Sequence, residues 1–287
     1  MQARLRLYFK YFLVLSGFML AAIIIDFGYR AQGGDGFLQV VVLDVGQGSA
    51  AYVVDPSGYE LVIDTGRNMQ GIRGLWQYRS IFDREIDEVI ISHADADHMS
   101  MLPYLVRNFD IGHISWSPYE FQGDVYEAVA QSLLETQQDT RTIYAPKTLQ
   151  PGADLALDIL WPPVEYEGSG RNNHSVVVRL RYQDADILFP GDIEQAVEED
   201  LVARYGDSLA AEVLVLPHHG SKSSSSYQFL EAVDPQLVII SAGEDNPYGH
   251  PHAEVLERLQ ELEIPVLNTA VVGDVVLRSD GEEIVVQ

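Results

Sequence analysis

The stretch SHADADH, residues 92–98, decides how this sequence is interpreted. It lies where a compact apolar run ends and a helical pattern begins, and it places four candidate metal ligands within six residues: His93, Asp95, Asp97 and His98. Alternate residues of an extended turn point the same way, so the first three can converge while the fourth faces a second ion. A solvated acidic turn would not require this alternation. The pattern therefore predicts a metal site.

Further candidate ligands follow two later predicted strands. Asp192 comes directly after an apolar run at residues 186–189, and the pair His218-His219 follows another at residues 213–216. In α/β proteins the loops that follow the strands open into one crevice, so these segments can meet the first one. The carboxylate of Asp192 is then placed to bridge two metal ions.

Two polar segments add groups that suit a substrate. Asn and Ser side chains can hydrogen-bond an oxyanion, and His250 or His252 can bind a phosphate or protonate a leaving group. Turn formation by Asn and Pro accounts for the same residues equally well, and both interpretations stay open. The first segment consists of Asn172, Asn173, His174 and Ser175, and the second is residues 246–252, which include His250 and His252.

Two divalent ions held about 3.5–4 Å apart would activate a water molecule and stabilise both oxygens of a displacement, which suits hydrolysis of a phosphodiester. The carboxylates of the first loop favour a harder ion such as Mn²⁺, while the imidazoles also suit Zn²⁺. We therefore expect two divalent metal ions, Mn²⁺ or Zn²⁺, as cofactors.

The composition limits the remaining classes of function. Of the 287 residues, 47% are hydrophobic, enough for a sizeable core, and the net charge of −25 argues against a broad electrostatic grip on nucleic acid. Solubility in a salty or extracytoplasmic setting explains this charge without a specific partner. Because the chain has no cysteine, disulfides, thiol nucleophiles and Cys-based zinc sites are excluded.

Residues 1–30 are expected to form an N-terminal anchor. Three basic residues precede an uncharged apolar run at residues 11–25, and no small-residue cleavage site follows, which favours a retained anchor over a cleaved signal or a buried core helix. The positive-inside rule then places the body outside the cytoplasm, or makes it secreted if the segment is cleaved. Residues 31–36 are expected to be a linker, and residues 37–287 one hydrolase domain.

The body alternates between predicted strands and helices. Short β-branched runs at residues 38–43, 51–54 and 61–63 predict consecutive antiparallel strands, and helical patterns follow at residues 99–108 and 125–137. The second half has the same design, which predicts stacked sheets covered by helices. Its predicted strands are residues 157–160, 175–181, 186–189, 213–216, 237–241, 266–268, 274–278 and 283–286, and its helices are residues 193–205, 226–233 and 253–261.

These motifs together resemble the metallo-β-lactamase superfamily, and within it the ComEC-type competence (DNA-uptake) branch. The resemblance runs from about residue 38 to residue 286 and implies an αββα sandwich with two metal ions between the sheets. Its elements occur in the family's order: LDVGQG (43–48), VIDTG (62–66), SHADADH (92–98), NNHS (172–175), LFPGDIE (188–194), LPHHGSKSSSS (216–226) and YGHPH (248–252).

The resemblance also implies roles for individual residues. His93 and Asp95 match ligands of the first metal, Asp97 and His98 match ligands of the second, and Asp192 matches the bridging carboxylate. His218 matches the later histidine ligand, with His219 and Ser221 beside it, and Asp64 matches a carboxylate that supports the site from outside. Asp97 and Asp192 are the residues on which catalysis is expected to depend.

The sequence departs from the family pattern at several positions. Many members have a histidine in the place of Asn172-Asn173, and whether His174 compensates is open. Met99-Ser100 replaces a Gly-Gly pair, and Ser49 replaces an aspartate. Competence proteins of this branch carry the domain on a large membrane channel, so the resemblance does not extend to DNA transport.

A membrane-anchored metal-dependent phosphodiesterase acting on single-stranded DNA is the leading hypothesis. Hydrolysis of another ester, such as a nucleotide or an envelope phosphodiester, and a non-catalytic accessory role in DNA uptake are the alternatives. No protein partner can be inferred. Four arginines with nearby aromatic residues are expected to form a DNA-guiding lip before the metal loop: Arg67, Arg73, Arg79 and Arg84.

Overall fold

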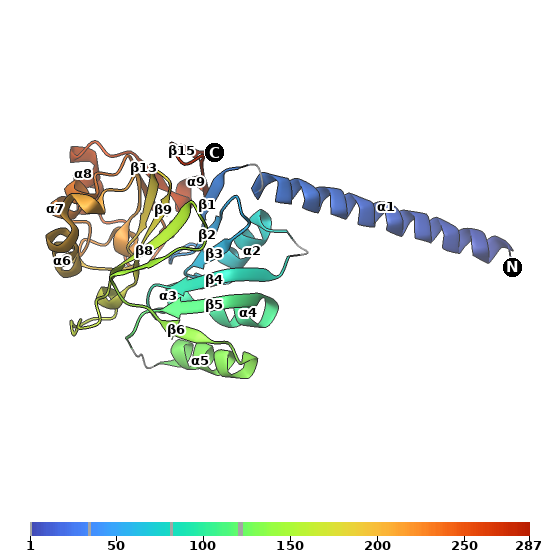
Figure 1. The fold of residues 1–287 in the computed structure, drawn as a ribbon, viewed down its shortest axis with the longest axis horizontal. Helices are drawn as coiled ribbons and strands as arrows, with labels where there is room; N and C mark the ends of the chain where they lie inside the picture. The colour runs from blue at the N-terminus through green and yellow to red at the C-terminus, as the bar shows by residue number, and fades with distance from the viewer. Residues whose placement is uncertain (1, 34–35, 81–82, 120–122) are drawn as a thin grey trace.

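A computed structural model of the chain describes residues 2–33, 36–80, 83–119 and 123–287. Its body is formed by two β-sheets packed face to face, with helices on both outer surfaces (Figure 1). The predicted αββα sandwich is therefore confirmed.

The first sheet has the strand order β15-β14-β1-β2-β3-β4-β5-β6. Strands β1, β2 and β3 pair antiparallel, as the sequence predicts, whereas β3 to β6 run parallel to one another. The strands are β1 (Leu38–Val42), β2 (Ala51–Val54), β3 (Glu60–Ile63), β4 (Glu85–Ile91), β5 (Asp110–Trp116), β6 (Thr140–Thr142), β14 (Val275–Ser279) and β15 (Ile284–Val286).

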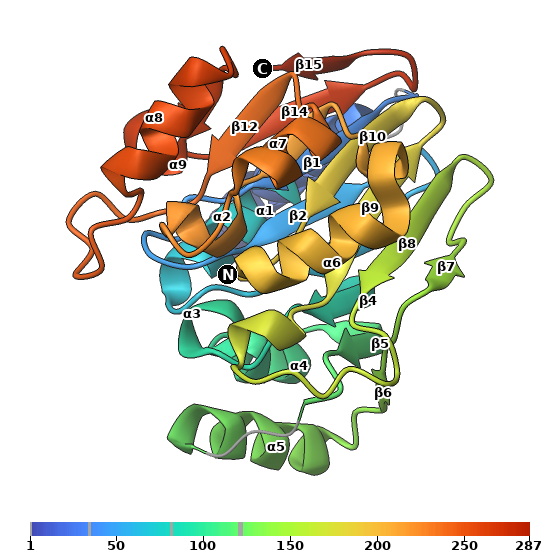
Figure 2. The ribbon, with the colours of Figure 1, turned by 90° about the vertical axis from the view of Figure 1, so that its left-hand side faces the viewer.

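The second sheet has the order β13-β12-β11-β10-β9-β8-β7, in which β10 to β13 are parallel. Helices α6, α7 and α8 cover its outer face (Figure 2). The strands are β7 (Lys147–Leu149), β8 (Leu155–Trp161), β9 (Val177–Tyr182), β10 (Ala185–Phe189), β11 (Val213–Val215), β12 (Leu237–Ile240) and β13 (Val266–Asn268).

The helices fall into groups by sheet. On the first sheet lie α2 (Met69–Tyr78), α3 (Ala96–Met99), α4 (Leu102–Asn108) and α5 (Asp124–Thr136). On the second lie α6 (Gln195–Tyr205), α7 (Tyr227–Val233) and α8 (Ala253–Glu261), and α9 (Thr269–Val272) follows β13. Short 3₁₀ turns are formed by residues Asn172–His174, Gly206–Leu209 and Pro217–Gly220.

Three apolar layers hold the sandwich together. One lies between the sheets, and one lies under the helices on each outer side. Strand β1 contributes side chains to two of these layers: Val40 faces the layer between the sheets, and its neighbour Val41 faces the helices of the first sheet. A strand buried on both faces requires a nearly continuous apolar run, and LQVVV supplies one.

The structure divides the helix predicted over residues 99–108. A short helix, α3, ends at Met99, and α4 starts at Leu102 with a proline in its first turn, a position that proline favours. Met99 is fully buried under the first sheet. Where the family has a Gly-Gly pair, this chain has Met99-Ser100, and the Met99 side chain therefore adds apolar volume to the core.

Residues Gln2–Gly33 form α1, which projects from the body (Figure 1). The helix thus includes residues 31–33 of the expected linker, and residues 34–35 lie outside the described part of the chain. Large apolar side chains such as Phe12, Leu15 and Phe18 are exposed on it. Among the described residues, no helix combines the length and the hydropathy that a membrane crossing needs. The anchor therefore stays a prediction.

The expected arginine lip is wrong for one of its four members. Arg79 is buried, with 2% of its surface exposed, and its guanidinium binds the carboxylate of Glu60 and the carbonyl of Glu85. Trp76 and Tyr78, the aromatic residues of the expected lip, lie on α2, and Trp76 packs on Phe109 at 4.9 Å between ring centroids. Arg79 thus ties α2 to the sheet and is not available to DNA.

We expect the substitution Arg79→Met to lower the free energy of unfolding by about 3–5 kcal/mol, because it leaves the carboxylate of Glu60 buried without its partner. Denaturant titration followed by circular dichroism measures this loss. Arg107→Ala is the matched control: Arg107 also pairs with a glutamate, Glu135, but both side chains are about half exposed, so a loss below about 1 kcal/mol is expected. Equal losses in the two variants would contradict this role.

Candidate metal centre

The predicted site residues meet where the two sheets face each other, at the carboxyl ends of parallel strands. Asp64 follows β3, the SHADADH loop follows β4, Asp192 follows β10 and the His218-His219 pair follows β11. Both sheets thus contribute to the crevice, as expected for the ends of parallel strands in α/β folds. The loops approach so closely that a Cβ at Gly191, whose φ is +62°, would lie 2.7 Å from Cβ of Ser175.

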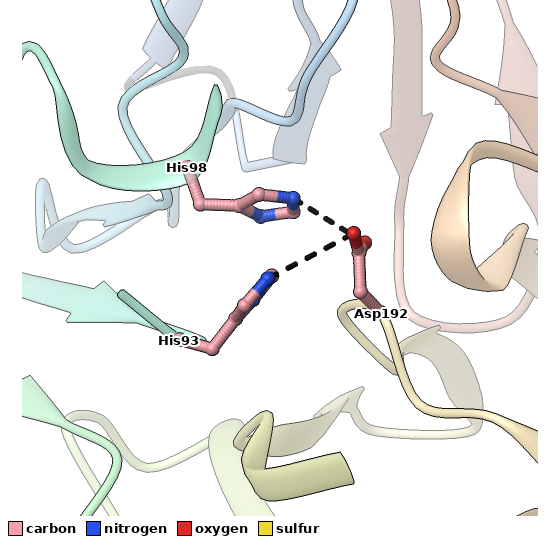
Figure 3. A group of neighbouring side chains, drawn as sticks. All are labelled: His93, His98 and Asp192. Atoms are coloured by element: carbon pink, nitrogen blue, oxygen red, sulfur yellow. Dashed lines mark ion pairs between the residues drawn. The ribbon is translucent and has the colours of Figure 1, made fainter. Parts of the chain in front are cut away.

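Two groups of side chains bring enough ligand atoms together to hold a metal ion. In the first group, Nε2 of His93 and Nε2 of His98 lie 3.8 and 3.3 Å from the carboxylate oxygens of Asp192 (Figure 3). In the second, Asp97 and His98 meet His219, whose Nε2 lies 3.5 Å from Oδ2 of Asp97. Nε2 of His219 is also 3.5 Å from Oδ2 of Asp192. The two groups therefore touch at His98 and Asp192.

The imidazoles of both groups are oriented as metal ligands. In each of the three, Nδ1 faces a hydrogen-bonding group: Ser92 Oγ at 3.1 Å for His93, Asp64 Oδ2 at 2.7 Å for His98 and the Ser241 carbonyl at 2.8 Å for His219. The opposite nitrogen, Nε2, is buried in all three and has no hydrogen-bond partner among the described residues. Buried nitrogens are rarely left in this state, and metal ions held by the two groups would satisfy all three. The residues present therefore fit divalent metal ions.

Asp64 supports this arrangement from outside the ligand groups. Its Oδ1 accepts the backbone N–H of Ser92 at 2.7 Å, and its Oδ2 lies 2.7 Å from both Ser92 Oγ and His98 Nδ1. A carboxylate at Nδ1 fixes the tautomer of His98 and directs its Nε2 lone pair toward the metal position. Asp64 thus lies where the family resemblance placed it.

Burial and mutual charge shift the pKa values of these groups strongly. Burial, with the neighbouring His98, lowers the pKa of His93 to about 3. Burial also works against protonation of His219, but Asp192 and Asp97 outweigh it and raise its pKa to about 9. His98 is raised well above its usual range against the same burial, by Asp192 and Asp64. Burial opposes the ionisation of Asp192, but the neighbouring His219 and His98 outweigh it and hold the pKa of Asp192 well below its usual range.

The structure adds His219 to the predicted ligand set. His218 and His219 both have left-handed backbone conformations, with φ of 52° and 55°, and such strain in consecutive non-glycine residues is typical of functional sites. The result is that His219 points into the second group. His218 instead has its Nε2 at 3.2 Å from Nδ2 of Asn172 and at 4.0 Å from Oδ2 of Asp192. Its role as a ligand stays a prediction.

Asp95 lies at the edge of the first group. Its Oδ2 is 3.9 Å from Nε2 of His93, while its Oδ1 pairs with the exposed guanidinium of Arg171 at 2.8 Å. The side chains that form the two ligand groups do not include Asp95. Arg171 directly precedes the NNHS motif, and the sequence marks it as a candidate for a basic groove that would favour DNA rather than as a neighbour of the metal site.

The NNHS segment serves mainly to build the crevice. Ser175 Oγ donates to the Asn172 carbonyl and accepts the Asp192 N–H, and Asn173 binds Glu194 through both its amide oxygen and its amide nitrogen. His174 packs on Tyr119 and lies 2.8 Å through Nε2 from the Gly168 carbonyl, outside both ligand groups. His174 therefore does not compensate for the family's missing histidine.

The remaining predicted residues border the crevice. His250 lies near the later histidine pair, with 5.6 Å between its ring centroid and that of His218, and its Nδ1 is buried without a hydrogen-bond partner among the described residues. Burial, with His218 and His219, lowers its pKa to about 4. His252 accepts the N–H of Lys222 at 3.2 Å, and Ser221 Oγ pairs with Ser223 Oγ at 3.0 Å. Of these, His250 is the one with a buried ring nitrogen that has no hydrogen-bond partner among the described residues.

Comparison with known proteins agrees with this geometry. The sequence profile of the metallo-beta-lactamase superfamily matches residues 44–244, which include both ligand groups. The chain belongs to the metallo-beta-lactamase superfamily. The superfamily fold and its divalent-metal chemistry follow from this membership, whereas the identity of the metal does not.

Curated relatives confirm the resemblance to the competence branch of the superfamily. The chain is 27% identical to ComE operon protein 3 of Bacillus subtilis over 90% of its own length, and 32% identical to competence protein ComA of Neisseria gonorrhoeae over 82%. It is 31% identical to Recombination protein 2 of Haemophilus influenzae over 83%. It spans only about a third of each of these relatives, namely 35%, 31% and 28%.

Solved structures share the fold at low sequence identity. The metallo-beta-lactamase fold protein YhfI of Bacillus subtilis superposes with a TM-score of 0.56 at 11% identity, over 84% of this chain and all of that one. Zn²⁺-bound PqqB of Methylobacterium extorquens has a TM-score of 0.51 at 14% identity, over 80% of this chain and 97% of that one. These likenesses support the superfamily fold.

Metal binding is expected to release protons. In the metal-free protein the raised pKa values keep His98 and His219 protonated at pH 7, and a metal ion must displace those protons to reach Nε2. The apparent affinity for Mn²⁺ should therefore rise with pH up to about 9. Calorimetric titrations at one pH in buffers of different ionisation enthalpy count the released protons, and a heat of binding that does not depend on the buffer would contradict the expectation.

Asp64→Asn is expected to weaken metal binding by about 10–100-fold, because His98 loses the carboxylate that fixes its tautomer. Equilibrium dialysis followed by metal analysis measures the change. Asp55→Asn is the matched control, since Asp55 is also buried and also accepts backbone N–H groups, but in the turn that follows β2. The control should retain wild-type affinity.

Proposed function

We propose that the protein is a metal-dependent phosphodiesterase that cleaves single-stranded DNA. The observation that carries the proposal is the pair of ligand groups that touch at His98 and Asp192, because adjacent sites for two ions suit displacement at phosphorus. The names of relatives such as competence protein ComA support DNA as the substrate. Since the chain spans about a third of those relatives, their other properties are not carried over.

The ligand set indicates which residues would hold the ions. His93, His98 and Asp192 would hold the first, and Asp97, His98 and His219 surround the position of the second. The mixture of imidazoles and carboxylates suits Mn²⁺ or Zn²⁺, and we propose Mn²⁺ because three carboxylates, those of Asp95, Asp97 and Asp192, border the two positions. When bound, such ions activate a water molecule and neutralise charge that develops on the phosphate.

The chain's own residues complete the site. Asp192 stays ionised at neutral pH and so remains a ligand. His250 is neutral, because its pKa is lowered to about 4, and its role is therefore that of a hydrogen-bond donor to a phosphate oxygen rather than of a proton donor. Arg171, with 56% of its side chain exposed, provides a positive charge at the mouth of the site.

The net negative charge of the protein favours a substrate that contacts only a small part of its surface. With 18 basic against 43 acidic residues, a long DNA duplex would be repelled over most of the surface. A flexible single strand can enter one crevice, where metal ions and Arg171 supply local positive charge.

Attachment to a membrane through residues 1–30, with the body outside the cytoplasm, is part of the proposal and rests on the pattern of the sequence. Basic residues precede the apolar run, and α1 exposes large apolar side chains such as Phe12, Leu15 and Phe18.

The test is hydrolysis by the full chain in detergent after metal removal and readdition of Mn²⁺ or Zn²⁺, with single-stranded DNA, duplex DNA and bis-p-nitrophenyl phosphate as substrates. We expect metal-restored cleavage of single-stranded DNA. The variants Asp97→Ala and Asp192→Ala should lose more than about 100-fold in rate, since loss of even an outer partner of a metal ligand costs about 10–100-fold.

Asp110→Ala, which removes an exposed carboxylate at the start of β5, is the control and should cleave at the wild-type rate. Cleavage of the small diester alone would move the substrate to a nucleotide or an envelope phosphodiester. Absence of turnover with metal bound would instead support the accessory role.

A further inference from the structure

A cavity of about 250 Å³ lies beside the metal centre and has no part in the function proposed so far. Its walls come from the ends of β4, β5 and β6 and from the first turn of α5. The volume is below the roughly 300–1,000 Å³ typical of pockets for drug-sized ligands, so it suits a single flat ring system. The lining residues are Ile91, His93, Ala94, Trp116, Ser117, Pro118, Tyr119, Tyr126, Thr140 and Thr142. We call this cavity the aromatic pocket.

Aromatic rings form much of the aromatic pocket. The rings of Trp116 and Tyr126 are stacked, with 6.2 Å between centroids and 25° between planes. Tyr119 stacks on His174 at 4.1 Å. Trp116 and Tyr126 are partly buried: they pack against the apolar core of the first sheet and also line the pocket. Stacked, accessible rings are the usual platform for a nucleobase in proteins that bind single strands.

The other residues that line the aromatic pocket provide no charged group for a charged ligand. Thr140 and Thr142 contribute hydroxyl groups, the hydroxyl of Ser117 donates to the His174 carbonyl, and the described lining residues include no Lys, Arg, Asp or Glu. A phosphate would find no cation there. The base and the sugar are the uncharged parts of a nucleotide, and of the two the base has the flat ring that stacks on aromatic side chains and the hydrogen-bonding edge that suits hydroxyls.

The position of the aromatic pocket links it to the metal centre. Trp116 ends β5 and lies opposite Ile91, the last residue of β4, two positions before His93. His93 has its Nε2 toward Asp192 and at the same time forms part of the pocket wall. A ligand in the pocket therefore lies against the ring of a metal ligand, at the same edge of the sheet.

We infer that the aromatic pocket binds the base of the nucleotide that adjoins the scissile phosphate, by stacking on Trp116 and Tyr126. This inference rests on the proposed function and makes it more specific: the substrate is a diester of a nucleoside. The pocket has no charged group that would distinguish one base from another, so the preference is for any nucleobase over none.

Kinetics with a matched pair of substrates test the inference in the full, Mn²⁺-loaded chain. Thymidine 5′-(p-nitrophenyl phosphate) and methyl p-nitrophenyl phosphate share the leaving group and differ in the nucleoside. Trp116→Leu should lower kcat/KM for the thymidine ester by about 5- to 150-fold, the range of one lost base stack, and leave the methyl ester within about twofold. Equal losses for the two esters would overturn the inference.

Two further variants make the result independent of a folding defect. Trp76→Leu removes a tryptophan that packs on Phe109 away from the pocket, and it should leave the ratio between the two esters unchanged. Thr142→Phe fills the pocket from its exposed edge without removing a core residue, and it should act like Trp116→Leu. An unchanged ratio in Thr142→Phe would overturn the inference.

A binding measurement separates this inference from the proposed function. The metal-free chain is titrated with 2-aminopurine deoxyriboside, whose fluorescence is quenched by stacking. Quenching by the wild type that is lost in Trp116→Leu and kept in Trp76→Leu supports the pocket even if neither ester is hydrolysed, an outcome that would defeat only the phosphodiesterase proposal. Absence of quenching by the wild type would overturn the inference.

Discussion

The carboxylate of Asp64 connects the fold to the metal centre. It is 2% exposed and sits in a left-handed backbone conformation at the end of β3, where it binds the N–H and the hydroxyl of Ser92 and Nδ1 of His98. These contacts hold the loop that follows β4 against the end of the neighbouring strand. The positions of His93, Asp97 and His98 all depend on the start of this loop, so the geometry of the site follows from one buried carboxylate and its three partners.

The loop is held from its other side by close backbone packing. Gly48, the last residue of LDVGQG, lies so near the carbonyl of Asp97 that any Cβ there would clash, and the N–H of Ser49 donates to the same carbonyl at 3.2 Å. Ser49 replaces the family's aspartate, yet its backbone retains this contact. This segment thus supports the metal loop through the close approach of Gly48 and the N–H of Ser49, and it supplies no side chain to either ligand group.

The layered fold and the ligand-bearing loops could be predicted because they rest on strong local patterns. The sequence could not show which of two adjacent histidines is the ligand. His218 and His219 have the same side chain, and only their left-handed backbone conformations decide which imidazole points into the second group. The expected arginine lip is wrong at Arg79 because charge in a sequence does not reveal a partner, and Glu60, nineteen residues before Arg79, supplies one. Strand β5 was missed because Gly112 and His113 interrupt its apolar pattern, although Gly112 allows close approach to the Asp87 carbonyl.

The two ligand groups draw on both sheets. Asp64, His93, Asp97 and His98 belong to loops of the first sheet, and Asp192 and His219 belong to loops of the second. During synthesis the chain therefore cannot assemble either group until residue 192 or residue 219 has left the ribosome and the two sheets have packed together. Formation of a complete ligand group is in this sense a late event in the life of the molecule, because the first half of the chain supplies only part of each group.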